Sequence, residues 1–242
     1  MLSLLLAFIA IAYLRGWRAL RSSAPAIPAW RAASFLAGLL CTWVAAASPV
    51  AFLDKQILTA HMAQHLLLMT FAPPLIWLGS PLRILLWGPR WAGPLGNPAF
   101  CWLSAAATLT IWHAPALLRL GMESHVWHSI EHASFLVSGL LFWWPVVQPW
   151  PSVPRWPRWS MLLYLFLATL PCDVLAGLLV FSDRVAYPAY LCTPRQSGFS
   201  ALADQQCAGA LMWTCVTVVF LVAGAVLSTQ LLAPQAASEE PA

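Results

Sequence analysis

The amino-acid sequence predicts an all-α integral membrane protein, a bundle of about seven transmembrane helices with its N-terminus outside and its C-terminus inside. Of its 242 residues, 61% are apolar and only 8% are charged, whereas about a quarter of the residues in a soluble domain are charged. The mean hydropathy is +0.75. This composition excludes a large soluble domain. The arginines are scattered through short loops, so we expect the lipid bilayer and no nucleic acid as a partner.

Apolar stretches of about 18 to 25 residues predict the individual spans. The first stretch is followed, rather than preceded, by basic residues, so it is expected to be a retained span and not a cleaved signal peptide. Residues 1–233 are expected to form one seven-helix domain, and residues 234–242 a disordered tail. The predicted spans lie near residues 2–14 (running toward 20), 30–48, 56–79, 99–118, 126–147, 160–181 and 207–232.

The distribution of lysine and arginine predicts the orientation. The loops after the first, third and fifth spans carry eight basic residues, and the loops after the second, fourth and sixth carry four. Because cytoplasmic loops are enriched in lysine and arginine, the first set is expected to be cytoplasmic. The sequence therefore predicts a multi-pass protein of a bacterial cytoplasmic (inner) membrane, with its N-terminus outside.

Under this orientation every histidine of the sequence lies in the outer part of the bundle. Two histidine pairs have a spacing of four residues, which places both members on one helical face. Ionisable residues inside a membrane are costly and usually face a site within the bundle. Imidazole binds copper, zinc, iron and nickel. The predicted metal ligands are His61, His65, His113, His128 and His132.

Several other side chains of the outer zone are expected to support this site. Carboxylates commonly orient histidines that bind a metal, and sulfur is a ligand for Cu(I). Methionine, however, fills gaps in a core more often than it binds a metal. The predicted auxiliary residues are Asp54, Glu131, Asp204, Cys207 and Met62.

Four residues leave their roles open or point to a plain structural role. His125 lies nearest the loop and is expected to be an interfacial group. Cys207 could be a thiolate ligand, or it could form a disulfide with Cys192 in an oxidising space. Asp173 lies inside the sixth span and needs a partner there, so we expect it to be structural.

Five motifs occur in order between about residue 55 and about residue 220: "HMAQHLLLMTFAPPLIWLGSPLR", "WHAPALL", "HSIEHASFLVSGLLFWWPV", "AYPAY" and "LADQQCAGALMW". Together they resemble the multispanning cytochrome c oxidase assembly factors called CtaG, which are unrelated to the single-span copper protein of that name. The resemblance implies delivery of copper to the active-site metal centre of a haem–copper oxidase. The implied partner is the oxidase catalytic subunit or its assembly intermediates. The family's histidine motifs fall on the five histidines above, and its acidic motif on Asp204, whereas Asp173 departs from the family pattern.

Three functions remain open on the residues alone. A copper site poor in thiolates can release its ion, which suits a metallochaperone that is not an enzyme. Paired histidines on facing helices are also the ligands of a bis-histidine haem protein. The third alternative is an intramembrane metal enzyme in which Asp204 or Glu131 acts as general base, although the sequence has no HExxH motif.

Overall fold

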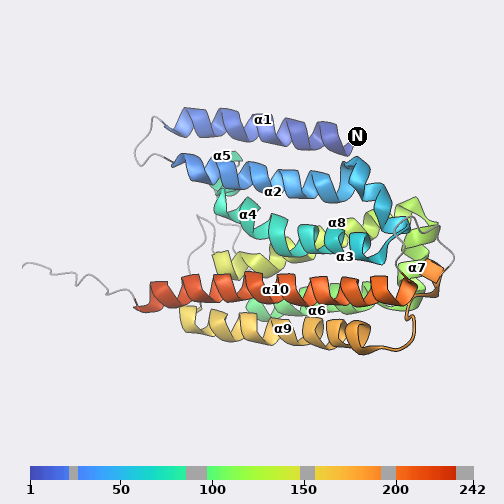
Figure 1. The fold of residues 1–242 in the computed structure, drawn as a ribbon. Helices are drawn as coiled ribbons and strands as arrows, with labels where there is room; N and C mark the ends of the chain where they lie inside the picture. Colours follow the sequence, from blue (N-terminus) through green and yellow to red (C-terminus); the bar gives the residue numbers. More distant parts are fainter. Residues whose placement is uncertain (22–26, 86–96, 148–155, 192–199, 233–242) are drawn as a thin grey trace, which may run out of the picture.

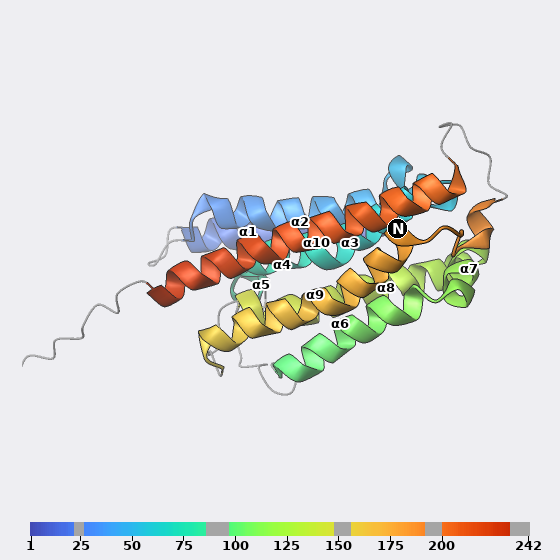
Figure 2. The same cartoon turned by 60° about the horizontal axis from the view of Figure 1, so that its bottom comes forward.

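A computed structural model describes residues 1–21, 27–85, 97–147, 156–191 and 200–232, and every regular element in these ranges is a helix. The long helices run side by side along one direction (Figures 1 and 2). The elements are α1 (Leu2–Arg21), α2 (Ala29–Ala47), the 3-10 helix η1 (Pro49–Lys55), α3 (Leu58–Leu66), the π-helix η2 (Leu67–Phe71), α4 (Ala72–Leu78), α5 (Pro81–Leu85), α6 (Pro98–Trp112), α7 (Pro115–Glu123), α8 (His125–Val147), α9 (Arg158–Phe181), the 3-10 helix η4 (Pro188–Leu191) and α10 (Ala201–Leu232).

Within the described ranges, five helices are long and apolar enough to cross a membrane, namely α1, α2, α8, α9 and α10. A sixth span results if α6 and α7 are counted together. The predicted span at 56–79 corresponds to α3, η2 and α4, which follow one another without a gap. The chain is therefore a membrane protein whose regular elements are all helices in the ranges that the structure describes. The tail predicted at 234–242 lies outside the described residues.

The predicted span at 99–118 is broken, because α6 and α7 meet at an angle of 75°. Pro115 causes the break: proline disfavours the helical conformation for the residue before it, and Ala114 is accordingly extended, with φ −64° and ψ 128°. The 75° bend turns α7 out of the direction of the long helices, and α7 lies at the end of the bundle that also holds the N-terminus (Figure 1).

The segment α3–η2–α4 lies at the centre of the bundle, where it contacts α2, α8 and α10. Its π-helical turn is marked by the bond from the Ala72 N–H to the Leu67 carbonyl, five residues back. Pro73 has no N–H to donate to the Met69 carbonyl. The indole Nε1–H of Trp143, from α8, donates to that carbonyl instead, at 3.1 Å.

A close approach of backbones accompanies this bond. A Cβ atom at Gly139 of α8 would lie 2.8 Å from both the Cα and the carbonyl oxygen of Met69. Only glycine therefore allows α8 to pack this tightly against η2. Because α3 and α8 carry the two histidine pairs, this contact sets the position of one pair relative to the other.

The antiparallel course of the chain brings distant segments to one end of the bundle. The N-terminus, η1, the start of α3, α7, the start of α8 and the start of α10 all lie there (Figure 1). The histidines of the sequence lie on or beside these segments, so the fold gathers them at one end.

We predict that Gly139→Ala lowers the free energy of unfolding by about 1–3 kcal/mol, because the added methyl group collides with backbone that cannot move aside. Gly177→Ala in α9 is the control, since a Cβ there would have no atom within 4 Å. The thermal unfolding midpoint of the detergent-purified protein measures the effect. Equal midpoints for the two variants would contradict the close contact between α8 and η2.

Candidate metal centre

The five predicted ligand histidines come together at this end of the bundle, from α3, from the end of α6 and from α8. Between the two pairs, the ring centroids of His61 and His128 are 6.3 Å apart, and those of His65 and His132 are 6.2 Å apart. His113 lies 5.9 Å from His65. Four of the rings belong to buried residues, and the side chain of His128 is 18% exposed.

Two carboxylates lie inside the histidine cluster rather than behind it. Oε1 of Glu131, which is 0% exposed, lies 3.4 Å from Nε2 of His61 and 3.2 Å from Nε2 of His65. Oδ2 of Asp54 lies 2.7 Å from Nε2 of His128. In two groups, Asp54–His61–His128 and His61–His65–Glu131, the ligand atoms all lie within 4.8 Å of one another.

Several polar atoms of this cluster have no hydrogen-bond partner in the described part of the chain. They are Nε2 of His61, both ring nitrogens of His65, Nε2 of His128, Nε2 of His132 and both oxygens of Glu131. The contacts between Glu131 and the α3 histidines have ion-pair distances but not hydrogen-bond geometry. An unsatisfied buried polar group costs about 1–3 kcal/mol. A metal ion binds nitrogen and carboxylate lone pairs directly, so this donor set fits one.

His113 is held in one tautomer by its own helix. Its Nδ1–H donates to the Leu109 carbonyl at 2.8 Å, which leaves Nε2 without a proton in the neutral ring. Nε2 lies 3.3 Å from Sδ of Met62. A backbone carbonyl commonly orients a metal-binding histidine in this way, so the free nitrogen of His113 and the Met62 sulfur are both available at the edge of the cluster.

Two tyrosines to which the sequence analysis gave no role hold the site from outside the spans. The hydroxyl of Tyr187 donates to the His113 carbonyl at 3.1 Å, and that of Tyr190 donates to the Asp54 carbonyl at 2.7 Å. Burial raises the pKa of Tyr187 to about 12, so its hydroxyl keeps the proton it donates. No local sequence pattern marks these tyrosines, because each acts through a hydrogen bond to a distant segment of the chain.

Asp54 is also outside the spans, in η1. Burial acts to raise the pKa of its carboxyl, but the contact with Nε2 of His128 outweighs burial and lowers the pKa below its ordinary value. Asp54 is therefore a carboxylate near neutral pH, as a metal ligand must be.

Asp204 lies outside both groups of candidate ligands and acts on α3 instead. From α10, its carboxylate accepts hydrogen bonds from the N–H groups of Leu58 and Thr59, at 2.8 and 3.1 Å, and from the Thr59 hydroxyl, at 2.7 Å. A carboxylate at a helix N-terminus satisfies N–H groups that have no partner within the helix. Asp204 thus fixes the start of the helix that carries His61.

The remaining predicted residues lie away from the two groups. Cys207 and His125 are exposed. Cys192, the alternative disulfide partner of Cys207, lies outside the described residues. Gln205, which the sequence analysis did not select, is 0% exposed; its side chain accepts from the Ala186 N–H at 2.7 Å and anchors the loop before η4.

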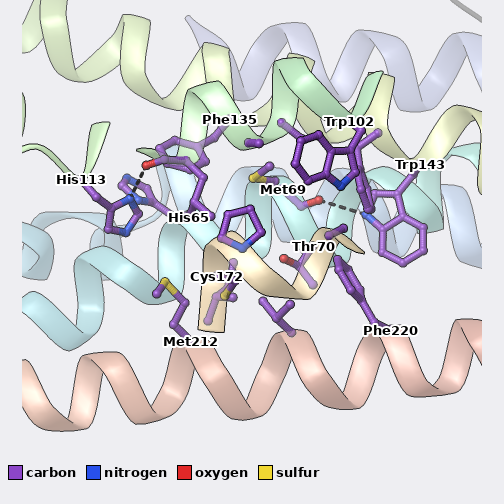
Figure 3. A pocket seen from close by; sticks show the side chains of 18 of the residues that line it. His65, Met69, Thr70, Trp102, His113, Phe135, Trp143, Cys172, Met212 and Phe220 are labelled. Atoms are coloured by element: carbon purple, nitrogen blue, oxygen red, sulfur yellow. Dashed lines mark hydrogen bonds between the residues drawn. The ribbon is translucent and has the colours of Figure 1, made fainter. Parts of the chain in front are cut away.

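A cavity of about 60 Å³ adjoins the cluster. His65 and His113 form one end of it, and Trp143 and Phe220 line the other, as Figure 3 shows. Sulfur-bearing side chains line its wall, namely Met62, Met69, Cys172 and Met212. The cavity therefore leads from the imidazoles toward the middle of the bundle.

We predict that Asp204→Ala lowers the free energy of unfolding by about 1–3 kcal/mol, because buried N–H donors at the start of α3 lose their acceptor. Metal affinity should fall by about 10- to 100-fold, as it does when a supporting residue is removed. Thermal unfolding and metal titration of the purified protein measure the two effects. Asp183→Ala, which removes an exposed carboxylate from the same end, is the control. Wild-type behaviour of Asp204→Ala would contradict the role given to this carboxylate.

Comparisons with known proteins show the family of the chain. Two uncharacterised proteins, from Mycobacterium bovis and Mycobacterium tuberculosis, are each 26% identical to the chain over 245 residues, and one from Mycobacterium leprae is 23% identical. These matches cover 92% of this chain but 37% of each relative, so the chain spans about a third of the relatives' length. No solved structure gives a significant match. Residues 11–233 match the family described as cytochrome c oxidase caa3 assembly factor, Caa3_CtaG, and the chain belongs to that family.

Proposed function

We propose that this protein assists the assembly of a cytochrome c oxidase by binding copper in the histidine cluster and delivering it to the active-site copper centre of the catalytic subunit or its assembly intermediate. One observation carries the proposal: buried imidazole nitrogens and the Glu131 carboxylate converge without hydrogen-bond partners of their own. Membership of a cytochrome c oxidase assembly family supplies the connection to an oxidase, and the imidazole-rich donor set supports copper as the ion that is delivered.

The donor set supports a site that can release its ion. The two groups offer imidazole and carboxylate, and Met62 adds a thioether at 3.3 Å from His113. No cysteine belongs to either group. A closed thiolate cage is typical of permanent structural sites, whereas mixed imidazole and carboxylate ligands bind copper while leaving room for exchange.

The geometry disfavours the haem alternative. A bis-histidine haem needs two imidazoles on opposite faces of a macrocycle, but here the ring of His65 stacks directly on Phe135, with centroids 3.9 Å apart. The adjoining cavity measures about 60 Å³, and a site for a molecule the size of a drug or cofactor needs at least about 300 Å³.

The enzyme alternative has less support because neither candidate general base can reach a substrate. A general base needs a substrate proton within hydrogen-bond reach. Glu131 is 0% exposed, and a Cβ atom at Gly121 of α7 would lie 2.7 Å from its Oε2, so α7 closes over it. Asp204 is occupied by the start of α3. The protein is thus proposed to carry a metal rather than to catalyse a reaction.

In this proposal the chain crosses the bacterial inner membrane seven times, with α3–η2–α4 as one span and α6–α7 as another. The cluster then lies at the periplasmic side, at the same end as the N-terminus (Figure 1). The support is the excess of arginine in the loops that follow the first, third and fifth spans.

Reporter fusions test this orientation. A reporter that is active only in the periplasm should be active when fused after Lys55 or Glu123, because both residues lie at the end that carries the cluster. The same reporter should be inactive after Leu85 or Leu232, at the other end. The reversed pattern would place the cluster in the cytoplasm and contradict periplasmic delivery.

A double substitution tests copper delivery. His61→Asn with His65→Asn removes two imidazoles from the cluster, so copper affinity should fall by more than about 100-fold, beyond the effect typical of supporting residues. Copper retained by the purified protein and the spectrum and activity of the cell's oxidase are the measurements, with membrane abundance checked by immunoblot. We expect abundant protein and loss of active oxidase.

His125→Asn is the matched control, because it removes an exposed imidazole from the same end of the bundle. It should leave copper binding and oxidase activity unchanged. An abundant double variant that retains copper or supports normal oxidase would overturn the proposed function.

A further inference from the structure

We propose that the cluster offers two alternative positions to one metal ion, and that His61 belongs to both. The outer position consists of Asp54, His61 and His128, and the inner position of His61, His65 and Glu131. The ion passes between them while His61 remains a ligand. This inference rests on the metal binding in the proposed function, but not on the identity of the client protein.

The site has more donors than a single ion needs. Five histidines and two carboxylates surround the site, whereas a single tetrahedral ion takes about four ligands. Five of these seven donors form two sets that share His61: the carboxylate of Asp54 lies against His128, and that of Glu131 lies against the α3 histidines. In each set the ligand atoms lie within 4.8 Å of one another. Small movements of these side chains toward a bound ion would therefore bring all three into its coordination sphere.

The two positions differ in their exposure to solvent. The side chain of His128 is 18% exposed, and Asp54 belongs to η1, before the start of α3. Glu131 is 0% exposed, and its partner His65 also lines the cavity that leads to the middle of the bundle. An ion that enters from the end of the bundle therefore meets the Asp54 position before the Glu131 position.

The two positions have the same number of carboxylates. Each position contains one carboxylate, so a divalent ion has the same formal charge balance in either place, and the move does not leave it without a counter-charge. Two divalent ions at once would repel each other strongly in an apolar bundle and would compete for His61. The arrangement therefore favours one ion shared between two positions.

Cobalt(II) is the probe for this inference, since its visible absorption reports the ligand geometry, and the readout is independent of oxidase activity. The full-length protein in detergent should bind about one Co²⁺ per chain. Asp54→Asn should confine the ion to the inner position, and Glu131→Gln to the outer position. Each variant should bind one Co²⁺ with affinity reduced by about 10- to 100-fold, and the wild-type spectrum should be a weighted sum of the two variant spectra.

A second pair of variants distinguishes the loss of one metal position from local misfolding caused by a single substitution. His128→Asn should reproduce the spectrum of Asp54→Asn, and His65→Asn that of Glu131→Gln, because each pair removes the same position. His61→Asn should weaken binding at both positions and bind more weakly than any of these four, and His125→Asn should leave the spectrum unchanged.

The inference would be overturned if the wild-type chain bound two Co²⁺ ions or none, or if all variants that bind gave one common spectrum. It would also be overturned if both variants that remove the same position, such as Asp54→Asn and His128→Asn, failed to bind Co²⁺. Normal oxidase assembly in cells that carry His61→Asn with His65→Asn would instead contradict the proposed function and leave the two positions standing.

Discussion

The buried carboxylate of Glu131 is the constraint on which the histidine-bearing end of this bundle depends. A carboxylate with 0% exposure in an apolar protein is costly unless charged or hydrogen-bonding groups compensate it. The groups that meet it are the imidazoles of His61 and His65, from a different helix. Residue 121 of α7 is glycine, so no side chain there displaces the Glu131 carboxylate. The helix α7 therefore packs directly over this carboxylate and closes the site at the end of the bundle. The imidazoles and the carboxylate face one another here without hydrogen bonds. A metal ion bound between them would compensate the cost of burying these polar groups.

The backbone around Glu131 is held by features unusual inside a helix. Proline and a π-helical turn free the Met69 carbonyl for Trp143, and Gly139 lets α8 approach that turn. At the end of the bundle, Asp204 of α10 holds the start of α3. The α3 histidines thus lie between two fixed points, at the start of their helix and just after it. Such irregular turns in helices are frequent at functional sites.

Much of this could be predicted from the sequence, for identifiable reasons. Hydropathy marks the long helices, and the spacing of four residues puts each histidine pair on one face. The sequence does not reveal which partner a buried carboxylate meets, because that depends on helix packing; Glu131 was expected to support the ligands but lies among them. Tyr187, Tyr190 and Gln205 act through backbone atoms of distant segments, so no local pattern marks them. The break between α6 and α7 follows from Pro115, yet the apolar stretch continues past it.

The central claim is that imidazoles and carboxylates, rather than sulfur, bind copper at the end of the bundle that carries Glu131. X-ray absorption at the copper edge of the copper-loaded, detergent-purified protein tests it most directly. The account predicts a shell of nitrogen and oxygen neighbours at about 2.0–2.1 Å with the outer scattering of histidine rings. A shell dominated by sulfur at about 2.3 Å, or a protein that retains no copper, would contradict it.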